Sequence, residues 1–68
     1  MDLKSIGRLI QIRRKFLKVS QQDLSEIAGI SERTLRDIEK GLANPELETL
    51  SNICHALGLE IKVGIRKQ

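Results

Sequence analysis

The side chains best suited to bind a partner lie close together in residues 32–36. Arg33 and Arg36 carry guanidinium groups, which can bind the O6 and N7 acceptors of guanine as a fork, and Glu32 can accept a hydrogen bond from cytosine N4. Thr34 lies between them and can touch a thymine methyl group or a phosphate. The spacing of Glu32 and Arg36 is also that of an ordinary solvated ion pair on a helix. These four residues are therefore candidates for contacts to base edges, provided that a helix presents them outward.

The sequence offers no catalytic or metal-binding constellation. His55 is the only histidine and Cys54 the only cysteine, whereas a zinc site needs four ligands, or three and a water. We expect Cys54 to be a small buried residue on the apolar side of a helix. No glycine-rich phosphate loop is present, and a helical core of this size leaves no sizeable pocket. We therefore predict that the chain is not an enzyme and uses no cofactor.

Length and charge limit the remaining possibilities. Sixty-eight residues predict a single small domain with a formal net charge of +3. Residues 1–18 hold six cations against one acid, whereas residues 19–61 hold eight acids, so binding to a polyanion must depend on a few placed cations. The chain has a single cysteine, no apolar run of about 18 residues and no signal-peptide pattern, so we expect a soluble cytoplasmic protein without membrane contact.

Apolar residues at helical spacing predict four helices that would hold the candidate residues in place. The predicted helices span residues 3–17, 21–28, 32–40 and about 46–57. We expect Ile27 to face inward from the second helix and Leu47 from the fourth. The corner at Gly29-Ile30-Ser31 is short enough to let the third helix project from the surface and enter the major groove of B-DNA.

Polar residues and glycines mark the breaks between these helices. Ser20 and Ser31 are expected to cap the second and third helices with their hydroxyl groups, and Gly29 to end the second helix in a left-handed conformation. For the fourth helix, Asn44 is the expected cap and Pro45 the expected first residue, where the missing N–H has no consequence.

The apolar period changes after residue 58. Leu59, Ile61, Val63 and Ile65 alternate with polar or small residues, which predicts a β-strand with one apolar face. The chain has no second strand, so we expect this strand to pair antiparallel with the same strand of a second copy. A frayed terminus is the alternative. We therefore assign residues 1–58 to the helical domain and residues 59–68 to a dimerisation element.

Residues 20–41 follow a recognisable order. The pattern [ST]-Q-x-x-L-A-x-x-x-G-[VI]-S-x-x-x-[IL]-x-x-x-E-x-G is matched by Ser20, Gln21, Leu24, Gly29, Ile30, Ser31, Leu35, Glu39 and Gly41. This order resembles the XRE or phage-repressor (Cro/C1-type) helix-turn-helix family, and the likeness covers about residues 5–58. The resemblance implies an all-α, lambda-repressor-like DNA-binding domain. It also implies a homodimeric transcriptional repressor that binds a pseudo-palindromic operator in double-stranded DNA.

The resemblance also implies roles for single residues. Gln21, Lys40 and Asn44 would contact DNA phosphates, with Lys15 and Lys18 as further candidates. Gln21 would in addition brace the third helix through Glu32.

Two family positions concern the fold itself. Arg14 and Glu39 match an internal arginine and glutamate, which by resemblance form a buried structural ion pair between the first and third helices. Lys18 stands where the family usually has glycine, so a backbone with positive φ at this point would carry a modest cost.

The alternation after residue 58 further resembles HipB-like antitoxins. That resemblance implies an autoregulating antitoxin of a type II toxin–antitoxin pair, bound to a kinase-like toxin. Under this alternative the chain is mainly a protein-interaction adaptor, and Leu9, Ile12 and Phe16 would form its contact surface. Packing of the same three residues against a second copy is the simpler interpretation.

Overall fold

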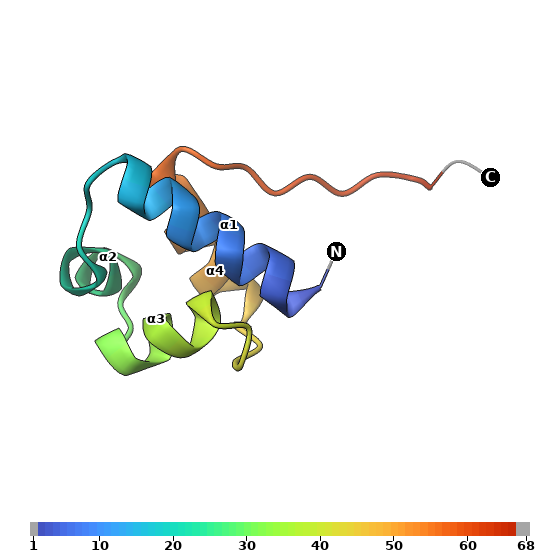
Figure 1. Cartoon of the computed structure of the whole chain (residues 1–68). Coiled ribbons are helices and arrows are strands. Elements are labelled where there is room, and N and C mark those ends of the chain that lie inside the picture. The colour runs from blue at the N-terminus through green and yellow to red at the C-terminus, as the bar shows by residue number, and fades with distance from the viewer. Residues whose placement is uncertain (1, 67–68) are drawn as a thin grey trace.

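Four helices and an extended tail make up residues 2–66, the part of the chain that the computed structural model describes (Figure 1). The helices are α1 (Leu3–Phe16), α2 (Gln21–Ala28), α3 (Glu32–Glu39) and α4 (Leu47–Leu57). Their bounds lie within about one residue of those predicted from the sequence. The prediction of a four-helix, all-α fold is therefore confirmed.

One apolar core joins the four helices. α1 packs on α3 and α4, and α2 packs on α3 and α4. The largest fully buried side chains come from every helix: Ile10, Leu24, Leu35, Ile38, Ile53 and Leu57. Burial of one such side chain contributes about 1.5–3 kcal/mol, and this set therefore holds α2 and α3 in a fixed relation.

The caps fix where the two short helices begin and end. Ser20 Oγ accepts a hydrogen bond from the N–H of Asp23 at 3.0 Å, and Ser31 Oγ accepts one from the N–H of Thr34 at 3.0 Å. Gly29 ends α2 with φ of 72°, a left-handed conformation that glycine adopts without steric cost. The predicted corner between α2 and α3 is thus confirmed in its caps and its turn residue.

A glycine allows α1 to cross α3 at very short range. A Cβ atom placed on Gly7 would overlap the carbonyl oxygen of Ile38 and lie 2.7 Å from that of Glu39. Any side chain at this position would therefore collide with backbone, which cannot move aside as a flexible side chain can. The crossing sets the distance between α1 and the last turn of α3.

The start of the fourth helix differs from the prediction. α4 begins at Leu47, and its N-cap is Glu46, which makes no side-chain capping hydrogen bond. The predicted cap at Asn44 and first helical position at Pro45 are wrong, because Glu46 is itself extended, with φ of −63° and ψ of 154°. Leu47 therefore lies at the helix end, ahead of the buried stripe, and is 71% exposed.

The inward face of α2 also differs from the prediction. Ile27 is 64% exposed, whereas Leu24, Ser25 and Ala28 are buried. At 100° per residue, these three residues span one arc of the helix, and Ile27 lies about 60° outside it. The small Ser25 fits inside the arc because its hydroxyl donates to the carbonyl oxygen of Gln22 at 2.8 Å. The prediction that Ile27 faces the core is wrong.

Residues 59–66, which we call the tail, are extended but form no strand. Gly58 ends α4 with φ of 70°, and the N–H of Leu59 donates to the carbonyl oxygen of Cys54 at 2.8 Å. The end of the tail leaves the helical body (Figure 1), and Val63 and Ile65 are fully exposed. The predicted strand is not formed in this chain, because a lone extended segment has no neighbour for its N–H and C=O groups. Pairing with a second copy stays a prediction, and residues 67–68 of the predicted element lie outside the described residues.

None of the helices in residues 2–66 combines the length and the apolar character needed to cross a membrane.

Candidate nucleic-acid interface

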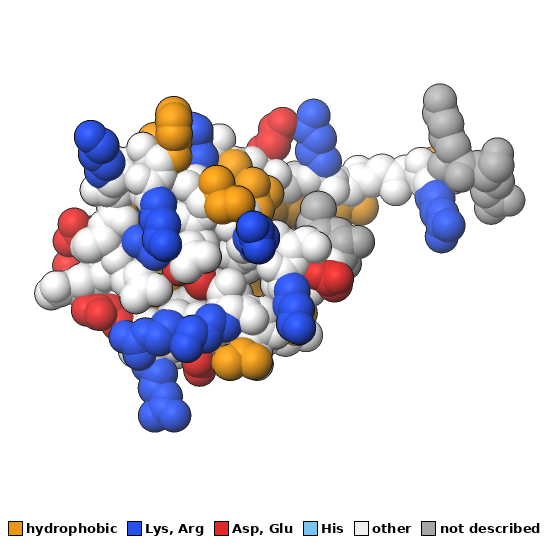
Figure 2. Space-filling model, in the orientation of Figure 1, with side chains coloured by type: hydrophobic (Ala, Val, Ile, Leu, Met, Phe, Trp, Pro, Cys, Tyr) orange, Lys and Arg blue, Asp and Glu red, His pale blue; other side chains and the backbone are white. Residues whose placement is uncertain are grey.

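The helix α3 is sharply divided between a buried and an exposed side. Leu35, Ile38 and Glu39 are buried, whereas the four predicted base-contact residues are all exposed: Glu32, Arg33, Thr34 and Arg36. Figure 2 shows blue Lys and Arg side chains projecting at the lower edge of the molecule, where α3 lies. The structure thus brings the four candidates together on one accessible side of a short helix.

The charged side chains on the exposed side of α3 have no hydrogen-bond or ion-pair partner within residues 2–66. Within residues 2–66, none of the side-chain hydrogen bonds or ion pairs involves Glu32, Arg33 or Arg36. The ordinary i, i+4 ion pair between Glu32 and Arg36 is therefore not formed. Thr34 differs, because its Oγ1 accepts a hydrogen bond from the hydroxyl of Ser31 at 2.9 Å. That bond uses an acceptor site on Thr34 and leaves its methyl group and its own hydroxyl proton available.

The opposite end of α3 is held by a buried ion pair. Arg14 Nε lies 2.7 Å from Glu39 Oε2, and Arg14 Nη2 lies 3.0 Å from Glu39 Oε1, so the pair is bidentate. Arg14 Nη1 also donates to the carbonyl oxygen of Val19 at 3.0 Å. Arg14 is 8% exposed and Glu39 5% exposed. The pair that the family resemblance implies thus joins α1, the loop before α2 and the last turn of α3.

Gln21 braces α3 through a different residue from the one expected. Its Nε2 donates to Glu39 Oε1 at 3.1 Å, and no hydrogen bond to Glu32 is formed. The expected brace through Glu32 is wrong, because the side chain of Gln21 points along the surface toward the Arg14–Glu39 pair. An amide NH₂ has two N–H donors, so one remains for a further acceptor. The predicted phosphate contact of Gln21 stays a prediction.

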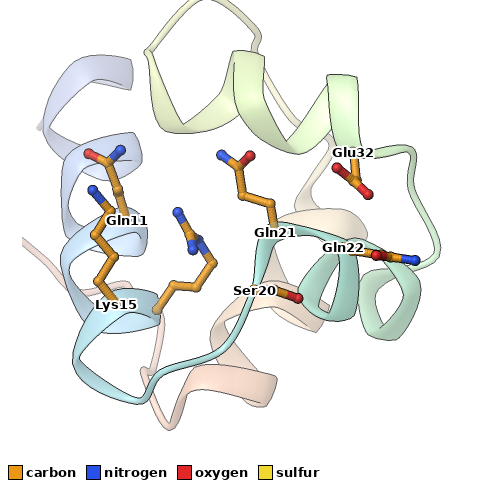
Figure 3. Close-up of a pocket in the computed structure, with 7 residues that line it drawn as sticks. Gln11, Lys15, Ser20, Gln21, Gln22 and Glu32 are labelled. Carbon is orange, nitrogen blue, oxygen red and sulfur yellow. The ribbon is translucent and has the colours of Figure 1, made fainter.

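A shallow polar hollow of about 600 Å³ lies where α1, α2 and α3 meet (Figure 3). Gln11 and Lys15 line it from α1, Gln21 and Gln22 from the start of α2, and Glu32 from the start of α3. Lys15 and the free N–H groups at the start of α2 favour an anion on their side of the hollow, whereas the Glu32 carboxylate on the opposite wall repels one. The side of the hollow that Lys15 and the start of α2 line is therefore the part suited to an anion.

Two residues of this hollow, Gln11 and Gln22, had no predicted role. Gln11 lies four residues before Lys15, and this i, i+4 spacing places both on one side of α1. Gln22 follows Gln21 in the first turn of α2, where polar side chains often meet anions. Both signals are present in the sequence.

The other predicted phosphate contacts are exposed at two places in the chain. Lys40 and Asn44 are exposed in the segment after α3, and Lys15 and Lys18 are exposed near the end of α1. Lys18 adopts φ of 59°, the only positive φ of a non-glycine residue in residues 2–66. The family position that usually holds glycine thus does have a left-handed backbone here, and Lys18 bears the cost.

The remaining reactive groups lie away from this surface. Burial raises the pKa of the Cys54 thiol, which keeps it protonated and weakly nucleophilic. Within residues 2–66 no group of three His, Cys, Asp or Glu side chains is arranged to hold a metal ion. The exposed side of α3 and the adjoining hollow are therefore the candidate site.

Comparisons with known proteins agree with this geometry. A family model described as "Helix-turn-helix" matches residues 10–63. The immunity repressor protein of Bacillus phage phi105 is 39% identical over 57 residues, which cover 84% of this chain but only 40% of that protein. The 10 kDa protein of the ImmF control region from the same phage is 35% identical over 63 residues, 93% of this chain and 70% of that protein. The crystal structure of the clp gene regulator ClgR from Corynebacterium glutamicum superposes with a TM-score of 0.81 at 28% identity, over 85% of this chain and 74% of that one.

Proposed function

Because the chain belongs to the helix-turn-helix family of XRE-type regulators and phage repressors, we propose that it binds double-stranded DNA at specific sequences and acts as a transcriptional repressor. The observation that carries the proposal is the exposed side of α3, whose charged groups have no partner among the described residues. A helix of this kind fits the major groove with its first turns against the base edges.

Specificity in this proposal comes from four residues of α3. Arg33 or Arg36 binds the O6 and N7 atoms of a guanine as a fork, Glu32 accepts from a cytosine amine, and Thr34 contacts a thymine methyl group. One bidentate contact contributes about 1–3 kcal/mol of discrimination, which corresponds to roughly 5- to 150-fold in affinity between the right and wrong base.

Position on the duplex comes from contacts to phosphates. The hollow between α1, α2 and α3 receives one phosphate, with Gln21 and Lys15 as donors and the start of α2 as a positive end. Lys40 and Asn44, beyond the other end of α3, contact a second phosphate. These contacts carry no sequence information themselves but set the register of α3 in the groove.

We further propose that the repressor is a homodimer on a pseudo-palindromic operator. Two copies of α3 then enter successive major grooves about 34–36 Å apart. Residues 1–58 form the DNA-binding domain, and residues 59–68 form the dimerisation element, in which the two tails pair as antiparallel strands. The exposed Val63 and Ile65 support this assignment, because an apolar tail gains by being covered.

Binding of variants to a selected DNA site tests the proposal. We expect Arg33→Ala to reduce the preference for the selected site over single-base variants by about 5- to 150-fold at one position. Arg8→Ala removes an exposed cation from α1 and serves as the control, with the sequence preference retained. Lys40→Ala should weaken binding to all sequences alike. It should also reduce the slope of the logarithm of the binding constant against the logarithm of the salt concentration by about one unit. An equal loss on every sequence for Arg33→Ala would contradict the role of α3.

A second candidate function is an autoregulating antitoxin whose main partner is a kinase-like toxin. The exposed Leu9, Ile12 and Phe16 on α1 are the observation that favours a protein contact. Under this alternative a kinase-like protein co-purifies with the untagged chain, and Ile12→Ser abolishes its capture. Failure to capture such a protein leaves the repressor as the function.

A further inference from the structure

An uncovered apolar stripe runs along the outer side of α1. Leu9, Ile12 and Phe16 are 50%, 55% and 72% exposed, and their spacing places them on one side of the helix. We call these three residues the α1 stripe. The ring of Phe16 carries the guanidinium of Arg13 over one face at 5.4 Å, so its other face is the one available for contact. Nothing in residues 2–66 covers this stripe.

An open apolar groove continues the α1 stripe toward the tail. The groove has a volume of about 420 Å³ and lies between α1, α4 and the first residues of the tail. Its apolar lining comprises Ile6, Leu9, Ile10, Leu50, Cys54, Leu59 and Ile61. The chain's own tail contributes only its first two aliphatic residues to this groove. The rest of the tail leaves the body, as Figure 1 shows.

The tail is the second uncovered apolar surface of the same chain. Val63 is 95% and Ile65 101% exposed, and both share a side with Ile61 because the segment is extended. The intervening residues Lys62 and Gly64 point the other way. Five extended residues, 62–66, span at most about 18 Å, slightly less than the two shorter extents of the chain, 22 and 19 Å. The tail is thus long enough to lie along most of one side of a neighbouring copy.

We infer that the α1 stripe and its groove are the docking site for the tail of a second copy of this chain, with Val63 and Ile65 as the anchoring side chains. The inference rests on the proposed dimer and names its contact surface. An isolated two-stranded ribbon is marginally stable in water, and packing on a helix is what stabilises it. The two paired tails present one apolar side, and the α1 stripes of the two copies supply the helical surface that such a ribbon needs.

The available area fits a specific dimer. The exposed fractions of the α1 stripe together with Ile61, Val63 and Ile65 amount to about four fully exposed side chains per copy. At on the order of 100 Å² of apolar surface for each side chain, two copies would bury about 800 Å² of apolar area. Apolar atoms form about 60% of a typical interface, so the total is about 1,300 Å², within the range of specific protein interfaces.

Sedimentation equilibrium of the full chain without DNA tests the surface. We expect a dimer whose dissociation constant rises about 30- to 100-fold in Ile12→Ser and in Val63→Ser, because each change removes one aliphatic contact from both copies. Leu47→Ser is the matched control, since Leu47 is 71% exposed on α4, and its dimer should match the unchanged chain. Circular dichroism confirms that the variants keep their helices. A monomer at all concentrations, or a dimer weakened only by Leu47→Ser, would overturn the inference.

A mixing experiment separates tail-to-stripe docking from contact between like surfaces. Ile12→Asp places a charge in the α1 stripe, and Val63→Asp places one in the tail. Each variant homodimer therefore has two tail-to-stripe contacts that contain a charged group. A mixture forms a heterodimer in which the intact tail of one copy meets the intact stripe of the other. We expect the heterodimer to be more stable than either variant homodimer by at least tenfold in dissociation constant. Absence of this gain would overturn tail-to-stripe docking.

The outcome is separate from that of DNA binding. If the variants lose dimerisation but still protect a single half-site at high concentration, the DNA-binding proposal stands and the docking surface is supported. If the chain dimerises as inferred but no DNA sequence is selected, the docking surface stands and the repressor proposal fails.

Discussion

Replacing Arg14 with methionine tests how α3 is held in place. Methionine roughly keeps the length of the side chain but removes the guanidinium, so Glu39 would be left 5% exposed with Gln21 as its remaining donor. Breaking a buried ion pair by removing one partner costs about 3–5 kcal/mol, since the other charge stays buried without compensation. A chain of 68 residues has a total stability of roughly 3–10 kcal/mol, so this change removes a large part of it.

The assay is thermal and urea unfolding followed by circular dichroism. A loss of 3–5 kcal/mol corresponds to a Tm lower by roughly 12–40 °C for a domain of this size. Arg33→Met is the matched control, because Arg33 is exposed on α3, and its stability should stay within about 0.5 kcal/mol of the unchanged chain.

The double variant Arg14→Met with Glu39→Leu, compared with the two single variants, forms a double-mutant cycle. Removing both charges avoids the buried unpaired carboxylate, so we expect the double variant to be more stable than Arg14→Met alone by about 2 kcal/mol or more. Its remaining cost comes from the carbonyl oxygen of Val19 and the amide of Gln21, which lose their partners. The reasoning is refuted if Arg14→Met costs less than about 1 kcal/mol, or if the two single effects simply add.

Three further predictions concern the backbone and one cap. Gly7→Ala should destabilise the chain by about 1–3 kcal/mol in urea unfolding, because the methyl group meets the carbonyl oxygens of Ile38 and Glu39, whereas Gly64→Ala, with open space around it, should have little effect. Lys18→Gly should stabilise it by about 0.5–1 kcal/mol by relieving the left-handed backbone at φ of 59°, and Lys18→Ala, which keeps the strain, should give no such gain. The hydrogen bonds from Ser5 hold the pKa of Asp2 below its ordinary value of 3.8, so its contribution to stability is present above about pH 4 and is lost as the pH falls below it. Asp2→Asn keeps the N-cap but should lose less stability than the unchanged chain between pH 6 and pH 2, and equal losses in the two chains would contradict the assignment.

Local chemistry explains why the helices could be predicted so closely. Ser20, Ser31 and Gly29 act on the backbone within three residues of their own position, so their effect does not depend on the rest of the fold. The side of α3 that faces outward follows from the same regular spacing. The Arg14–Glu39 pair came from family resemblance, since no local rule joins residues 25 positions apart.

The errors occurred where tertiary packing decides. Ile27 is apolar and yet exposed, because the side of α2 that packs on the core passes through Leu24, Ala28 and the small Ser25. α4 begins at Leu47 and not at Pro45, because the backbone of Glu46 is still extended. The close crossing at Gly7 has no signature in a single sequence beyond a glycine inside a helix. The tail alternates as a strand does, but a strand needs a partner that the single chain lacks.

The division of α3 into two sides has a consequence for how this protein could acquire new targets. Glu32, Arg33 and Arg36 make no side-chain hydrogen bond or ion pair within residues 2–66, whereas Leu35, Ile38 and Glu39 carry the attachment of α3 to the rest of the chain. Residues on the exposed side of α3 can therefore be substituted with little loss of stability, whereas those on the buried side are constrained by packing. Under the proposed function, a lineage of such proteins can diverge in the DNA it reads through three or four substitutions, without passing through unstable intermediates.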